Sequence, residues 1–190
     1  WIPSFDYPAV LWRVVNSTNP GAASTNAKPF IVRSTTNATF RFYVNDNSTI
    51  GDMYCTAVGN RTNDGVAPDQ PKRSLRDILL AYQLRGGDTV YIDTGSYVTN
   101  VASAFSTFDC GSPGRPLRIL GSSSGTVLRS SSAGVDVLEV TGAGNLDFEN
   151  LHLTGGRYGL YANGSSNISL RSIWSSNNVW GVYLAGNSRG

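Results

Sequence analysis

Two carboxylates near the C-terminal end of the chain are the residues best suited to acid–base chemistry. Asp147 and Glu149 lie two positions apart in an alternating apolar–polar run, so on a β-strand their side chains share one face. Such a pair can act as general acid and base, or hold a cation. Arg171 follows Glu149 by 22 residues, the period of a repeat described below. That spacing favours a surface ion pair, worth under about 1 kcal/mol, over catalysis.

The single histidine and an oxygen-rich loop are the other candidates for chemistry. His152 precedes Trp174 by 22 residues and has no nucleophile motif around it, so we expect ring stacking rather than general-base catalysis. The loop offers side-chain oxygens to calcium, although its spacing matches no known calcium loop and Asn-Asp-Gly is an ordinary turn signal. The residues of this weak calcium candidate are Asn60, Asn63, Asp64 and Asp69. Apart from calcium, we expect no cofactor.

Four aromatic residues form two pairs at the same spacing. Tyr161 and Tyr183 lie 22 residues apart, as do Tyr158 and Trp180. Rings stacked on adjacent turns of a repeat would offer a flat platform to a sugar face or to a partner protein, with Glu139 continuing the first column. The alternative is that the rings pack against a turn or against the N-terminal segment.

A 22-residue repeat positions all of these groups. From residue 134 onward, aliphatic, glycine and asparagine residues recur at this step, with short alternating runs between them. The residues in register are Leu138, Leu160 and Val182; Val140, Ala162 and Leu184; Gly142, Gly164 and Gly186; and Asn145 and Asn167. Leu117 and Ile119 fit one turn earlier at a step of 21. A β-sandwich would not keep this register, so the sequence predicts an all-β fold, a right-handed parallel β-helix with stacked inward aliphatics and an Asn145–Asn167 amide ladder.

A capping segment precedes the repeat. Ser74 and Asp77 are spaced as in a capping box, and the following apolar residues share one helical face. We therefore expect one short N-terminal capping helix over about 74–84, ended by Gly86-Gly87, which covers the open end of the first coil. The chain then divides into an extended apolar and aromatic arm with strands (1–50), a capping module (51–100) and coils of about 22 residues (101–190).

The capping module carries a family resemblance. The motifs are Gly59-Asn60 and Asn63-Asp64-Gly65, followed by Ser74-Leu75 and by the strand GDTVYIDTGSY at 87–97. Together they resemble the opening module of right-handed parallel β-helix repeat domains in large bacterial surface and adhesin-like proteins, within the pectate-lyase-like superfamily. The resemblance covers about residues 41–185. It implies the fold but not the activity, since the same opening module precedes pectate-lyase-like enzymes.

Composition and cysteine usage favour an extracellular location. The net charge is +2 and the basic residues are scattered, so we expect no nucleic-acid partner, and no apolar run is long enough to span a membrane. Two unrelated buried thiols are one interpretation of Cys55 and Cys110, and a disulfide that pins the cap to the solenoid is the one we favour. Asn-x-Ser/Thr sequons for glycosylation occur at Asn16, Asn37, Asn47, Asn60, Asn163 and Asn167.

These features favour a structural or adhesive surface protein over an enzyme. The chain stops at Gly190 in mid-coil, so we expect either a truncated sequence or a further subunit that covers this end. The composition of residues 1–12 indicates an apolar arm that docks on a neighbouring copy. Such docking would join copies head to tail into a fibre. A simple linker is the alternative. The competing functions are a carbohydrate-active β-helix of the polysaccharide lyase or hydrolase type and a sugar-binding module.

Overall fold

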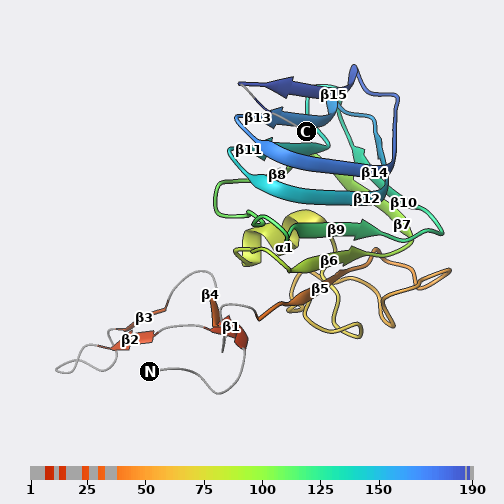
Figure 1. Cartoon of the computed structure of the whole chain (residues 1–190). Coiled ribbons are helices and arrows are strands. Elements are labelled where there is room, and N and C mark those ends of the chain that lie inside the picture. Colours follow the sequence, from red (N-terminus) through yellow and green to blue (C-terminus); the bar gives the residue numbers. More distant parts are fainter. Residues whose placement is uncertain are drawn as a thin grey trace.

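The computed structural model describes residues 7–10, 13–15, 23–25, 30–32, 38–186 and 188 (Figure 1). Before residue 38 it contains two short antiparallel strand pairs. One joins β1 (Tyr7–Val10) to β4 (Phe30–Val32), and the other joins β2 (Arg13–Val15) to β3 (Ala23–Thr25). The docking arm expected over residues 1–12 lies mostly outside the described residues.

From residue 38 onward the chain winds into a parallel β-helix with three lateral sheets (Figure 1). Sheet I contains β5 (Arg41–Val44), β6 (Thr89–Ile92), β9 (Leu117–Gly121) and the first halves of β12 (Gly144–Thr154) and β14 (Ser166–Ser176). Sheet II contains β7 (Gly95–Thr99), β10 (Thr126–Ser130) and the second halves of β12 and β14. Sheet III contains β8 (Ser103–Phe105), β11 (Leu138–Thr141), β13 (Tyr158–Asn163) and β15 (Trp180–Ala185). This confirms the predicted all-β parallel solenoid.

The bends between sheets depend on residues that tolerate a positive φ. β12 and β14 each turn from sheet I into sheet II at one such residue, Asn150 (φ 56°) and Ser172 (φ 50°). The turn into sheet I uses Asn145 (φ 55°) and Asn167 (φ 54°), and asparagine accepts this region more readily than most residues. Asn167 Nδ2 also donates to Asn145 Oδ1 at 3.2 Å, so the predicted amide ladder is confirmed.

The 22-residue register is confirmed in sheet III. Leu160 lies opposite Leu138 on one side and Val182 on the other, and Ala162 lies between Val140 and Leu184 in the same way. Leu138, Val140, Leu160 and Ala162 are fully buried. Val182 and Leu184 are 44% and 50% exposed, because β15 is the last strand of sheet III that the structure describes.

The step of 21 proposed for the preceding turn is wrong. Leu117 pairs with Leu146 and Ile119 pairs with Phe148 in sheet I, whereas Leu138 sits in sheet III opposite Ser103. Between β10 and β11 the chain runs through a loop at 131–137, which lengthens this turn. Inward aliphatics recur in any coil, so a similar spacing arose there between residues of different sheets.

A short helix, α1 (Leu75–Ala81), packs below β8 and beside β5 and closes the first coil (Figure 1). It ends three residues before the expected boundary, because Tyr82 adopts an extended conformation as the C-cap. Leu75 and Ile78 are buried against the core, as the helical face predicts. Within the part of the chain that the structure describes, the helical segments are all too short or too polar to cross a membrane.

Replacing the cap residue Ser74 by Ala is expected to lower the free energy of unfolding by about 1 kcal/mol. The Ser74 hydroxyl accepts a hydrogen bond from the Asp77 N–H and donates one to the Asp77 carboxylate. Urea denaturation followed by circular dichroism measures the change. Ser124→Ala is the matched control, since this exposed hydroxyl makes no hydrogen bond within the described residues. Equal midpoints for the two variants would contradict the capping role.

Candidate functional site

The outward side of sheet I carries two columns of side chains, one residue per coil. Residues two apart on each strand share this face, and the strands are in register. The first column runs through Tyr43, Tyr91, Leu120, Glu149 and Arg171. The second runs through Arg41, Thr89, Arg118, Asp147 and Ser169. We call the two columns together the sheet I strip.

A charged cluster of four residues occupies the C-terminal half of the strip. Arg171 Nη2 lies 2.8 Å from Asp147 Oδ2, and its Nε lies 3.8 Å from Glu149 Oε2. Arg118 Nη2 approaches the same Glu149 oxygen at 3.4 Å from the other side. The predicted pairing of Glu149 with Arg171 is thus confirmed and extended to Asp147 and Arg118. Both arginines remain about half exposed, so they are accessible to a ligand.

A tyrosine group of three rings occupies the N-terminal half. Tyr43 and Tyr91 stack with ring centroids 5.5 Å apart and planes at 18°. Tyr54, which belongs to the loop between β5 and α1, tilts over Tyr91 at 4.9 Å. Its hydroxyl donates a hydrogen bond to the Gly121 carbonyl at 3.3 Å. The tyrosine group therefore gathers residues from the cap and the first coil onto one face.

Asp93 holds Tyr54 in this position. Its carboxylate is fully buried and accepts hydrogen bonds from the N–H groups of Met53, Tyr54 and Cys55 at 2.6–2.7 Å, and from its neighbour Thr94. A single side chain thus ties the loop to the end of β6. No local pattern in the sequence indicates this role, because the groups that Asp93 binds lie about forty residues earlier.

The charge of Tyr54 is fixed by its surroundings. Burial raises the pKa of its hydroxyl, and the negative charges of Asp93 and Glu149 act in the same direction. Both effects favour the neutral phenol, which can donate a hydrogen bond.

The sheet I strip combines groups that can contact a sugar chain bearing carboxylates. Aromatic faces bind sugar rings through their apolar C–H surfaces. Guanidinium groups bind carboxylates with directed, charge-assisted hydrogen bonds. Neighbouring coils place successive residues of a column about 4.8 Å apart, a length similar to one sugar ring in an extended polymer. The carboxylates of Asp147 and Glu149 add groups that can accept or donate a proton.

The other aromatic candidates lie on different sheets. His152 stacks on Trp174 at 4.6 Å on the outward side of sheet II, as predicted, and its Nε2 is 2.7 Å from Ser176 Oγ. On sheet III, Tyr161 and Tyr183 stack at 6.0 Å with planes at 9°. Tyr158 lies opposite Trp180, and its ring packs on both Tyr161 and Tyr183. These rings form a separate group and do not join the sheet I strip.

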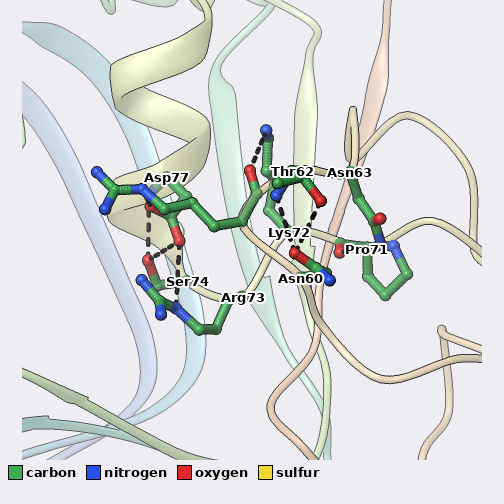
Figure 2. A network of polar contacts seen from close by, with 9 residues as sticks. Asn60, Thr62, Asn63, Pro71, Lys72, Arg73, Ser74 and Asp77 are labelled. Carbon is green, nitrogen blue, oxygen red and sulfur yellow. Dashed lines mark hydrogen bonds and ion pairs between the residues drawn. The ribbon is translucent and has the colours of Figure 1, made fainter.

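The calcium candidate uses its polar atoms to shape the loop (Figure 2). Asn60 Oδ1 accepts hydrogen bonds from the N–H and hydroxyl of Thr62, and Asn63 Nδ2 donates to the Pro71 carbonyl. The Asp64 carboxylate accepts a hydrogen bond from the Val66 N–H. Asp69 is exposed. Among the described residues, no cluster of three or more histidine, cysteine or acidic side chains is arranged to hold a metal.

The expected disulfide is not formed. Cys55 and Cys110 are both free thiols. The Cys55 sulfur is buried 3.7 Å from the Val44 carbonyl, and burial beside Asp93 raises its pKa. The Cys110 sulfur lies instead against the Thr107 carbonyl at 3.2 Å. The two side chains thus contact different segments, which corrects the predicted pairing.

The sequons differ in accessibility. Asn47, Asn60 and Asn167 are exposed, and Asn163 is half-buried. Asn16 and Asn37 lie outside the described residues. Glycosylation at these positions stays a prediction.

Comparisons with known proteins identify the fold. No family model and no curated protein matches the sequence. Among solved structures, a rhamnogalacturonan lyase is 18% identical to this chain, with a TM-score of 0.58. The match covers 78% of this chain and 39% of the lyase chain. An alginate lyase from Paenibacillus sp. str. FPU-7 is also 18% identical, with a TM-score of 0.45, and covers 54% of this chain and 37% of its own. The chain therefore spans well under half the length of either structure.

The likeness to rhamnogalacturonan lyase corrects one expectation from the sequence. We expected a protein that is not an enzyme, but the neighbour that shares the solenoid is a polysaccharide lyase. The ion pairs of the sheet I strip do not by themselves exclude catalysis. The adhesive scaffold gains no support from these comparisons. In its architecture, the chain is a parallel β-helix domain.

Proposed function

We propose that this β-helix is carbohydrate-active: it binds an acidic polysaccharide along the sheet I strip and cleaves it as a lyase. The observation that carries the proposal is the continuity of the tyrosine group with the charged cluster on one outward face. The rhamnogalacturonan lyase with the same fold supports it. Such a polymer lies outside cells, in agreement with the extracellular location that the sequons favour.

The four charged residues suit the chemistry of β-elimination. A sugar ring packs against the tyrosine group, while Arg118 and Arg171 pair with the carboxylate of a uronic acid unit. Neutralising that carboxylate makes the adjacent C5 proton more acidic. Glu149, released from its arginine partners by the substrate, accepts this proton. The electron pair left on C5 forms the C4–C5 double bond as the C4–O bond breaks, and the departing oxygen takes a proton from water.

The test is cleavage of rhamnogalacturonan, polygalacturonate and alginate, with neutral galactan as the control polymer. Ultraviolet absorbance follows the unsaturated product. Glu149→Gln is expected to lower kcat at least about a hundredfold, since it removes the base. Tyr91→Ala is expected to raise KM with a smaller effect on kcat, since it removes the platform for the sugar.

Glu139→Gln is the matched control for the base, because Glu139 faces outward on sheet III, away from the strip. It should leave both parameters unchanged. The proposal fails if no acidic polymer is cleaved or bound. The assignment of the base fails if Glu149→Gln and Glu139→Gln behave alike.

A further inference from the structure

A polar cavity lies at the cap, away from the charged cluster. It has a volume of about 640 Å³, within the range typical of small-ligand sites. Its lining includes Asp46, Arg61, Arg73, Arg76, Asp77 and Val98. None of these belongs to the sheet I strip. The cavity lies beside β7, the first strand of sheet II.

The cavity lies at the free edge of sheet II. Among the described residues, β7 pairs with β10 on one side and with no strand on the other. Below it, the chain leaves β5 after Val44 and turns into the capping loop, while α1 packs beneath sheet III. Asp46 Oδ2 accepts the Ser96 N–H at this free edge. Because a side chain already caps the edge, the site is poorly suited to an added peptide strand.

A buried carboxylate organises the wall of the cavity (Figure 2). Asp77 is 6% exposed, and its two oxygens lie 3.4 Å from Arg61 Nε and 3.7 Å from Arg73 Nε. The Ser74 hydroxyl donates to the same carboxylate at 2.9 Å. Lys72 Nζ donates to the Arg61 carbonyl at 2.9 Å and so fixes the loop that carries Arg61. Both guanidinium groups are therefore held in place while their side chains remain largely exposed.

The charges in the cavity favour an anion. Both carboxylates of the lining already have partners. Asp77 pairs with two arginines. Asp46 accepts hydrogen bonds from the N–H groups of Ser48 and Ser96. Arg76 also lines the cavity and has no acidic partner within the described residues. Among the described residues, the terminal nitrogens of Arg61 and Arg73 have no hydrogen-bond acceptor, because only the Nε atoms face Asp77. These terminal N–H groups can therefore donate to a ligand.

We propose that this cavity binds the carboxylate of a uronic acid unit and serves as a second subsite for the acidic polysaccharide. The inference rests on the proposed function. Arg76 pairs with the carboxylate, and Arg61 and Arg73 donate to the sugar hydroxyls. Val98, which is 62% exposed, offers apolar contact to one face of the ring. A neutral sugar would leave the guanidinium group of Arg76 without its partner.

The test uses isothermal titration of the full chain carrying Tyr91→Ala, which weakens binding at the strip. Digalacturonate, neutral galactobiose and inorganic sulfate are the three probes. We expect digalacturonate to bind, and Arg76→Ala to weaken this binding about tenfold or more. Arg76→Lys, which keeps the charge, should retain part of the affinity. Arg85→Ala is the matched control, because Arg85 is exposed and lies outside the cavity.

Three outcomes would overturn the inference. The first is equal affinity in the Arg76→Ala and Arg85→Ala variants. The second is galactobiose binding as tightly as digalacturonate. The third is sulfate binding as tightly and with the same dependence on Arg76, which would indicate a general anion site. Loss of cleavage in Glu149→Gln is a separate readout, so the lyase proposal can stand when this inference fails.

Discussion

Leu160→Asp is expected to unfold the C-terminal coils. Leu160 is fully buried and lies in register between Leu138 and Val182, so the new carboxylate has no partner and no water. An unpaired buried charge is costly, and we expect a loss of about 4 kcal/mol or more in the free energy of unfolding. Leu160→Ala, which leaves only a cavity, should cost about 3 kcal/mol. Urea denaturation ranks the two variants against the unchanged chain.

Hydrogen exchange localises the damage. Coils of a solenoid contact only their neighbours, so amides of β11, β13 and β15 should lose protection before those of β5 and β6. Ile50→Asp is the control, because Ile50 is 87% exposed and should tolerate a charge. A Leu160→Asp chain as stable as the Ile50→Asp chain would disprove the register that places Leu160 inside.

The sequence predicted the register where two coils have equal length and the same turn residues. Asn145 and Asn167 adopt nearly the same φ, and they begin sheet I strands that differ by one period. The prediction failed at Leu117, where the loop at 131–137 lengthens the turn. A fixed period in the sequence therefore indicates consecutive coils whose turns have equal length. A longer loop in one coil breaks the period but leaves the fold unchanged.

The sequence identified three of the four charged residues of the cluster, Asp147, Glu149 and Arg171, but neither Arg118 nor the surroundings of the cluster. The pairing of Glu149 with Arg171 followed from the period alone, since parallel coils align equivalent positions. Tyr54 reaches the same face from a loop without periodicity, through hydrogen bonds to a carboxylate thirty-nine residues later. The wall of the cap cavity is likewise formed partly by a residue from a loop without periodicity. Arg73 and Asp77 share a helical spacing that a sequence can reveal, whereas Arg61 joins them only through the folded loop.

Asp93→Ala is expected to release the capping loop from the solenoid. The carboxylate is the shared acceptor for the N–H groups of Met53, Tyr54 and Cys55, and its removal leaves these groups without an acceptor inside the fold. A buried N–H left unpaired costs about 1–3 kcal/mol. The Cys55 bond is buried and those of Met53 and Tyr54 are partly buried, so we expect a loss of about 3 kcal/mol in stability. Urea denaturation measures the loss, and Asp69→Ala, at an exposed aspartate of the same module, is the control.

Asp93→Ala also separates the loop from the scaffold as contributors to the sheet I strip. Leu138, Leu160 and the rest of the sheet III stack do not contact Asp93, so protection of their amides should persist in this variant. Tyr54 should leave Tyr91, and binding of polygalacturonate to the strip should weaken with it. Asp93→Asn keeps one acceptor oxygen in place and should fall between Asp93→Ala and the unchanged chain. If the Asp93→Ala chain keeps its amides protected across residues 53–55, another contact holds Tyr54 over the sheet.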